Sequence, residues 1–234
     1  MRYAVSPIVN PILQGYAIVA PSLHPSGATA STEQQAQRVP AAAEDAYSAT
    51  RYVAEHASEF GIDPSRIAVG GDSGGGNLAT VVAMMSRDRG GPALKFQLLI
   101  YPVTDFTEHA TQSERDYGHG YFLDEEMMDW FADQYFATKP HRLLPYGSPS
   151  NASDVRGLPP AMIITGECDP LRDQGEAYAE KLRSAGVSVV LKRYEGMIHP
   201  FVALAGIVDD GRVAINESAA AVRQALSAPA AANV

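Results

Sequence analysis

A serine flanked by glycines is the first feature of the sequence that could carry chemistry. The segment Gly71-Asp72-Ser73-Gly74-Gly75 has the form G-x-S-x-G. An apolar run at 66–70 leads into it and a helical pattern at 77–85 follows it, which is the strand–turn–helix context of an exposed nucleophile. Small residues suit such a tight and strained turn, because bulky side chains at Gly71 or Gly75 would clash with neighbouring backbone. We therefore interpret Ser73 as a nucleophile.

The alternative for this glycine-rich turn is a phosphate cradle in a nucleotide-binding protein. A Walker-type phosphate loop would carry a lysine after its glycines, and none follows here. In the nucleophile interpretation, the backbone N–H of Gly74 points into the site at the N-terminus of the next helix. There it can stabilise an oxyanion, which makes Gly74 the predicted oxyanion donor.

A nucleophilic serine needs a general base, and the base needs a carboxylate that orients it. In chains with this kind of turn the order is nucleophile, acid, base. Asp169 follows the apolar run at 161–165, and an acid just past a strand end lies where parallel sheets build their sites. Asp169 is the predicted acid, with Glu167 and Asp173 as alternatives that suit a supporting role and a helix start.

The predicted base is His199, which follows the apolar run at 187–194 and comes after the acid in the chain. The other histidines do not follow a late strand in this order, and we interpret them as ordinary surface or core residues. They are His24, His56, His109, His119 and His141.

Alternating apolar runs and helical patterns would position these residues. Strands are expected at 17–20, 66–70, 96–101, 161–165 and 187–194. Helices are expected at 42–60, 77–85, 175–185 and 214–226. This alternation predicts an α/β fold with a mostly parallel sheet flanked by helices, in a single domain spanning 1–234.

One segment, 106–156, interrupts the alternation. No strand is expected there, and 123–136 carries a helical pattern rich in methionine and aromatic residues. The segment is too long for a simple connection, so we expect a helical insertion that acts as a lid or packs on the core. The predicted pocket wall takes residues from the insertion, from the turn and from the region after the base: Tyr121, Phe122, Met127, Met128, Phe131, Asp72 and Phe201.

Composition narrows the class of protein further. The chain has 234 residues, a net charge of −9 and one cysteine, Cys168. An acidic surface gives nucleic acid no basic patch to bind, and a single cysteine excludes an intrachain disulfide. Apolar runs are short and interrupted, so we expect no membrane span, no signal peptide and a cytoplasmic location.

Taken together, these segments resemble the hormone-sensitive-lipase family of α/β-hydrolases, specifically its bacterial esterases, over about 39–204. The matching segments are VPAAAEDAY at 39–47, GIDPSRIAVGGDSGGGNLA at 61–79, LLIYPVTD at 98–105, GYFLDEEMMDWF at 120–131, GLPPAMIITGECDPLRD at 157–173 and RYEGMIHPF at 193–201. The resemblance implies a Ser73–Asp169–His199 triad and hydrolysis of short- to medium-chain carboxylic esters. It also implies no metal or organic cofactor, and a homodimer formed through the last strand and helix.

The sequence departs from the family pattern before the serine. The family has a loop of a histidine followed by glycines, whose N–H groups form most of the oxyanion hole, and no such run precedes Gly71. The N-terminal cap helices and first strands are also expected to be missing, which predicts a shortened sheet that associates through its uncovered edge. Gly74 stands where the family usually has alanine, and Pro200, which lacks a backbone N–H, where it has glycine.

Three interpretations therefore stay open at this point. The chain is a working esterase with a rebuilt donor loop around 21–29, a weakly active or inactive relative that binds acyl ligands, or a fragment of a longer gene.

Overall fold

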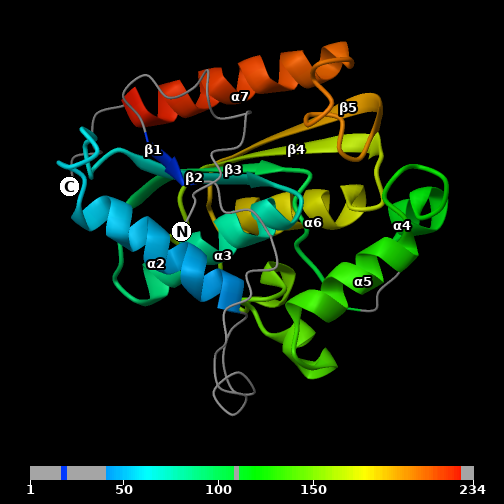
Figure 1. Cartoon of the computed structure of the whole chain (residues 1–234), viewed down its shortest axis with the longest axis horizontal. Helices are drawn as coiled ribbons and strands as arrows, with labels where there is room; N and C mark the ends of the chain where they lie inside the picture. The colour runs from blue at the N-terminus through cyan, green and yellow to red at the C-terminus, as the bar shows by residue number, and fades with distance from the viewer. Residues whose placement is uncertain (1–16, 20–40, 108–110, 228–234) are drawn as a thin grey trace.

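The chain folds around a parallel sheet with helices on both faces (Figure 1). The computed structural model describes residues 17–19, 41–107 and 111–227. Within these ranges five strands pair in the order β1-β2-β3-β4-β5, and each neighbouring pair is parallel. The strands are β1 Ala17–Val19, β2 Ile67–Asp72, β3 Leu94–Ile100, β4 Ala161–Cys168 and β5 Val189–Ile198. The predicted α/β architecture is confirmed.

Alternate residues of the central strands enter two separate cores, because successive side chains of a strand point to opposite faces. The helices that cover the sheet are α2 Ala41–Glu55, α3 Gly74–Asp88, α6 Arg172–Ser184 and α7 Asp209–Ser227. Leu99 and Ile163 pack in the core beneath α2, α3 and α6. Leu98 and Ile164 pack against α7 on the opposite face. In the described ranges, no helix combines the length and apolar character that crossing a membrane requires.

The boundaries of the predicted elements shift in places that matter for the site. The helix predicted at 77–85 begins at Gly74, because the chain turns directly from β2 into α3 despite the low helix propensity of glycine. The strand predicted at 187–194 continues to Ile198 and so ends directly before His199. The helix predicted at 42–60 ends at Glu55 and is followed by turns.

Between β3 and β4 the described residues form helices and no strand, as predicted for the insertion. These are α4 Gln112–Tyr117, α5 Glu125–Tyr135 and the 3-10 turns η1 Lys139–Leu143 and η2 Pro149–Asn151. The buried Asn77 of α3 ties the segment to the core, since its amide donates to the carbonyls of Val103 (3.0 Å) and Gly147 (2.8 Å). Helix α5 buries Ala132 and exposes Trp130, and its action as a lid stays a prediction.

The turn between β2 and α3 holds Ser73 in a conformation that few residues adopt. Its φ is +56° and its ψ is −122°, a strained region for a residue with a Cβ. The turn is tight because strand and helix nearly touch: a Cβ on Gly71 would lie 2.3 Å from the carbonyl carbon of Gly75. The Ser73 N–H also donates to the Ile100 carbonyl of the neighbouring strand at 2.9 Å. The predicted need for glycine at position 71 is confirmed.

Replacing Gly71 with alanine is expected to lower the free energy of unfolding by about 1–3 kcal/mol, because the backbone of Gly75 must shift to admit the methyl group. Gly206→Ala is the matched control, since a Cβ at Gly206 meets nothing within 4 Å. That variant is expected to stay within about 0.5 kcal/mol of the wild type. Urea denaturation followed by circular dichroism measures both, and equal effects of the two variants would contradict the close approach.

Candidate active site

Each of four neighbouring strands in the sheet is followed directly by a residue of the candidate site. Ser73 follows β2, Tyr101 follows β3, Asp169 follows β4 and His199 follows β5. Because the strands are parallel, these ends lie along one edge of the sheet. The fold thus converts four positions that are far apart in sequence into one cluster.

Ser73, His199 and Asp169 form a continuous chain of hydrogen bonds. His199 Nε2 lies 3.1 Å from Ser73 Oγ, and His199 Nδ1 lies 2.8 Å from Asp169 Oδ2. Asp169 is fully buried and His199 is 5% exposed, so water does not compete for the bond between them. A carboxylate at Nδ1 fixes the tautomer that leaves Nε2 able to accept a proton from the serine. The three residues predicted as nucleophile, base and acid are brought together.

The turn after β4 holds the Asp169 carboxylate in place. Its second oxygen, Oδ1, accepts a hydrogen bond from the Leu171 N–H at 2.8 Å, and its carbonyl accepts one from the Arg172 N–H at 3.0 Å. Gly166 allows β4 to approach the end of β5, which precedes the base, because a Cβ there would lie 2.6 Å from the Met197 carbonyl oxygen. The acid and the base are therefore positioned by backbone that packs closely together.

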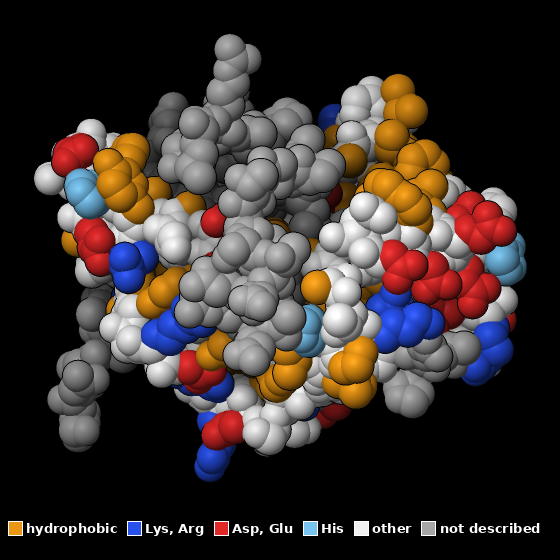
Figure 2. Space-filling view, turned by 60° about the horizontal axis from the view of Figure 1, so that its bottom comes forward, with side chains coloured by type: hydrophobic (Ala, Val, Ile, Leu, Met, Phe, Trp, Pro, Cys, Tyr) orange, Lys and Arg blue, Asp and Glu red, His pale blue; other side chains and the backbone are white. Residues whose placement is uncertain are grey.

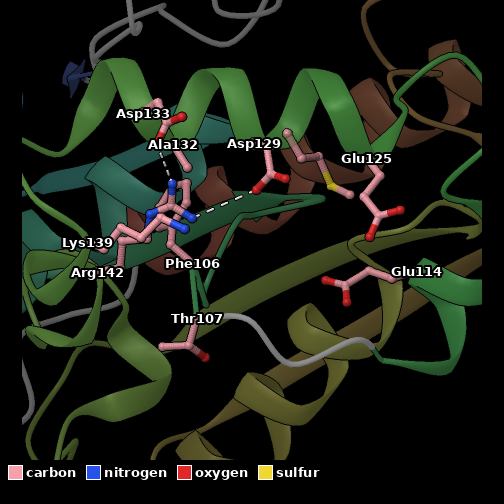
Figure 3. A pocket seen from close by; sticks show the side chains of 10 residues that line it. Phe106, Thr107, Glu114, Glu125, Asp129, Ala132, Asp133, Lys139 and Arg142 are labelled. Atoms are coloured by element: carbon pink, nitrogen blue, oxygen red, sulfur yellow. Dashed lines mark hydrogen bonds and ion pairs between the residues drawn. The ribbon is translucent and has the colours of Figure 1, made fainter.

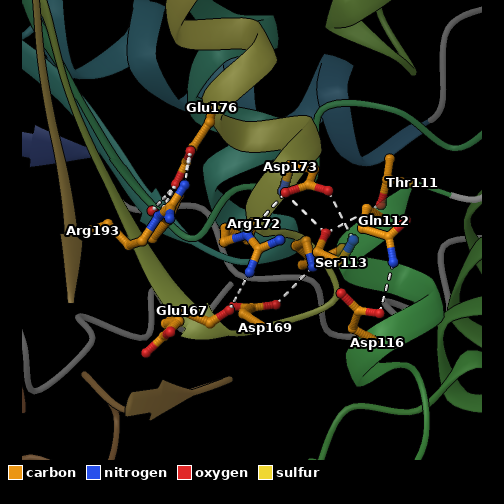
Figure 4. A network of polar contacts seen from close by, with 12 residues as sticks. Thr111, Gln112, Ser113, Asp116, Glu167, Asp169, Arg172, Asp173, Glu176 and Arg193 are labelled. Carbon is orange, nitrogen blue, oxygen red and sulfur yellow. Dashed lines mark hydrogen bonds and ion pairs between the residues drawn. The ribbon is translucent and has the colours of Figure 1, made fainter. Parts of the chain in front are cut away.

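The two alternative acids occupy other places, as Figure 4 shows. Glu167 lies in β4 and accepts the Gly196 N–H of β5 at 2.7 Å, so it links these two strands near their ends. Asp173 accepts the Ser113 N–H at 2.8 Å and the Arg172 Nε–H at 2.9 Å. Burial acts to raise the pKa of the Asp173 carboxyl, but the hydrogen bonds from Arg172 and Ser113 outweigh it and hold that pKa below its usual range. Of the three candidates, Asp169 is the one bonded to His199.

One side chain that was not predicted for the site, Tyr101, lies against the base, and Phe201 packs behind it. The Tyr101 ring meets the His199 imidazole edge to face, with ring centres 4.5 Å apart, and Phe201 packs behind Tyr101 at 5.9 Å. Both aromatic residues are 1% exposed. Burial, and then the nearby Asp72 carboxylate, raise the pKa of the Tyr101 hydroxyl well above its usual range, so it stays neutral. Phe201, predicted as a pocket residue, thus lies in the core behind Tyr101.

Asp72 lies at the end of β2, directly before the serine, and is partly buried. Burial raises the pKa of its carboxyl, and the opposing effects of its own backbone N–H and of His199 are smaller. Asp72, predicted as a pocket residue, thus lies next to the nucleophile in the chain and close enough to His199 for the two groups to interact electrostatically.

The predicted pocket residues of the insertion lie on the surface. Tyr121, Phe122, Met127 and Phe131 are all exposed, and Phe122 is 62% exposed. Figure 2 shows one face of the molecule, on which exposed hydrophobic side chains lie beside a group of acidic side chains. The structure therefore does not gather these four residues with the triad into an enclosed wall.

A cavity of about 300 Å³ lies within the insertion and has a charged lining (Figure 3). Arg142 projects toward Asp133 at 2.7 Å and Asp129 at 3.8 Å. Met128 is the one predicted pocket residue that borders this cavity. The lining consists of Phe106, Thr107, Glu114, Glu125, Met128, Asp129, Ala132, Asp133, Lys139 and Arg142. Charged walls do not suit an acyl chain, and no member of the triad lines this cavity.

The oxyanion donor predicted at Gly74 begins helix α3. The first N–H groups of a helix have no partner within it, and they point along the positive end of the helix dipole. This places a donor next to Ser73 in sequence and at a favourable end of the helix. The rebuilt loop predicted around 21–29 lies outside the described residues, as do His24 and His109. In the described ranges, no group of three or more His, Cys, Asp or Glu side chains could hold a metal ion.

Comparison with known proteins gives relatives that are esterases by name. The carboxylesterase NlhH of Mycobacterium tuberculosis is 43% identical over 199 residues, which cover 81% of this chain and 60% of the relative. The ethyl acetate hydrolase of Pseudomonas putida is 41% identical over 185 residues, covering 77% of this chain and 58% of the relative. The chain thus spans less than two thirds of the length of either relative.

Solved structures give the same result. The esterase of Pyrobaculum calidifontis superimposes with a TM-score of 0.78 at 45% identity, over 82% of this chain and 63% of that one. A thermostable esterase from Pseudomonas putida gives a TM-score of 0.79 at 43% identity, over 83% of this chain and 62% of that one.

A family model described as the α/β hydrolase fold matches residues 36–203. The match includes the turn with Ser73, the acid Asp169 and the base His199, together with the whole insertion. Its extent agrees with the resemblance inferred from the motifs. The chain therefore belongs to the hormone-sensitive-lipase type of α/β-hydrolases.

Proposed function

We propose that the chain is a serine carboxylesterase that hydrolyses carboxylic esters through an acyl-enzyme on Ser73. The observation that carries this proposal is the hydrogen-bonded chain from Ser73 through His199 to the buried Asp169. Relatives named as a carboxylesterase and an ethyl acetate hydrolase support the same substrate class. Small-molecule esters are thus the proposed partners of this site.

The geometry supports the following sequence of steps. His199 Nε2 takes the Ser73 proton while Oγ attacks the ester carbonyl, and the imidazolium that forms is stabilised by Asp169. The backbone N–H of Gly74 donates to the oxyanion of the tetrahedral intermediate. His199 then protonates the leaving alkoxide, which leaves the acyl group on Ser73. Water, activated by the same histidine, attacks the acyl-enzyme and restores the free serine.

A weakly active acyl-ligand binder is the second candidate. The small number of oxyanion donors that we can assign favours it. Gly74 is the one donor that we assign within the described residues. Loss of a single donor costs about 10²–10³ in rate, or about 2.7–4 kcal/mol of transition-state stabilisation. Acylation by the triad is partly separable from this stabilisation, so the binder would react slowly with an activated probe and turn esters over poorly.

Ser73→Ala is expected to abolish labelling by a fluorophosphonate probe and to lower p-nitrophenyl butyrate hydrolysis by at least about 10³-fold, because the attacking oxygen is gone. Ser153→Ala is the matched control, since Ser153 is an exposed serine of the insertion. We expect this variant to react with the probe and to hydrolyse p-nitrophenyl butyrate at the wild-type rate. Absence of labelling in correctly folded wild-type protein would reject the esterase, and labelling with little turnover would favour the binder.

We expect p-nitrophenyl butyrate to be hydrolysed with a higher kcat/KM than p-nitrophenyl palmitate. A long acyl chain gains about 0.8 kcal/mol per methylene only where that methylene is buried. The predicted wall residues, such as Phe122 and Phe131, are themselves exposed and so bury little of such a chain. Steady-state kinetics below the micellar concentration of each ester measures the preference. The reverse order would show that an extended apolar groove is present.

A homodimer and a cytoplasmic location are further proposals, which the resemblance and the composition support. Strand β5 borders the described sheet and pairs on one side only, with β4. Unpaired backbone groups at such an edge are the usual site of strand-to-strand association.

A further inference from the structure

Helix α4 of the insertion contacts the turn that carries the acid through a fully buried serine, Ser113. The Ser113 hydroxyl donates to the Pro170 carbonyl at 2.8 Å and accepts the Asp173 N–H at 3.1 Å. The Ser113 N–H donates to the Asp173 carboxylate at 2.8 Å. Pro170 and Asp173 lie on both sides of the turn that follows Asp169, so these three bonds hold it from outside (Figure 4).

Arg172 closes the same turn from the other side. Its Nε–H donates to Asp173 Oδ1 at 2.9 Å, and its Nη1–H donates to the Glu167 carbonyl at 2.8 Å. The guanidinium thus spans the chain from position 167 to position 173, with Asp169 between. It also lies 5.4 Å from the centre of the Tyr117 ring at the end of α4. Only a planar guanidinium offers donors in the fixed geometry that such a double contact needs.

The Asp169 carboxylate is held by one hydrogen bond from its own turn and by its bond to the base. Asp169 Oδ1 accepts the Leu171 N–H within the turn, and Asp169 Oδ2 is bonded to His199 Nδ1. Any change in the path of the turn therefore moves Oδ2 relative to the imidazole. Movements of about 1 Å in a reacting group can cost about 10²-fold in rate.

We propose that Ser113 and Arg172 are positioning residues: by joining helix α4 to the turn around Asp169, they keep its carboxylate within hydrogen-bond distance of His199. The insertion then has a role in catalysis through the position of the acid. As a statement about rate, this inference rests on the proposed esterase function. As a statement about the Asp169–His199 bond, it stands on geometry alone.

Ser113→Ala and Arg172→Lys test the proposal, with Ser153→Ala as the matched control. The first removes the hydroxyl, and the second keeps the positive charge but loses the double contact. For both we expect kcat for p-nitrophenyl butyrate to fall about tenfold to hundredfold while KM changes less than about twofold. The downfield proton resonance of His199 Nδ1–H should broaden or disappear in both variants. Ser153→Ala should leave kcat and the resonance unchanged.

The kcat and the His199 resonance together distinguish failure of the positioning role from failure of the proposed function. If Ser113→Ala and Arg172→Lys keep the wild-type kcat and the resonance, the proposal is overturned. If Ser113→Ala does not fold, as judged by circular dichroism, Arg172→Lys decides alone, since lysine keeps the positive charge beside Asp173. If the wild-type protein hydrolyses no ester, the proposed function fails, and the resonance still decides the positioning role. An unchanged resonance in the folded variants then rejects it, and a lost one supports it.

Discussion

The pairing of β4 with β5 is the constraint on which the site depends. Cys168 and Ile198 are partners in this ladder, and Asp169 and His199 are the residues that follow each of them. The pairing of the two strands therefore brings Asp169 and His199 side by side, and the hydrogen bond between their side chains forms directly beyond the last backbone pair. A register irregularity between Gly166 and Cys168, where the two chains approach too closely for a Cβ, sets the final alignment. Ser73 joins this pair from β2, across the intervening strand β3.

The parts of the site that the sequence predicted are those marked by local pattern. Ser73 carries a glycine signature, and Asp169 and His199 each follow an apolar run in the order that the chemistry requires. Strand interiors were predicted well for the same reason, because apolar runs report burial directly. The start of α3 at Gly74 was not predicted, since glycine has a low helix propensity and the turn is held by packing of strand against helix.

The parts that were not predicted depend on contacts between distant segments. Ser113 reaches Asp173 across 60 residues, and nothing near Ser113 indicates it. Tyr101 was predicted as the last residue of the strand at 96–101, whereas β3 ends at Ile100 and Tyr101 follows it as the other site residues follow their strands. Phe201 shows the converse problem: hydrophobicity alone does not distinguish a pocket wall from the core. The exposed aromatic residues of α5 likewise read as pocket or packing residues until their surroundings are known.

The placement of each site residue one position beyond a strand has a consequence for folding. Successive side chains of a strand point to opposite faces, so a slip of one residue between β4 and β5 would send Asp169 and His199 to different sides of the sheet. A chain with the right helices and the wrong register would still be compact and would bury much of the same apolar surface. Chemical reactivity at Ser73 therefore reports the fidelity of strand pairing, which spectroscopic measures of secondary structure do not distinguish.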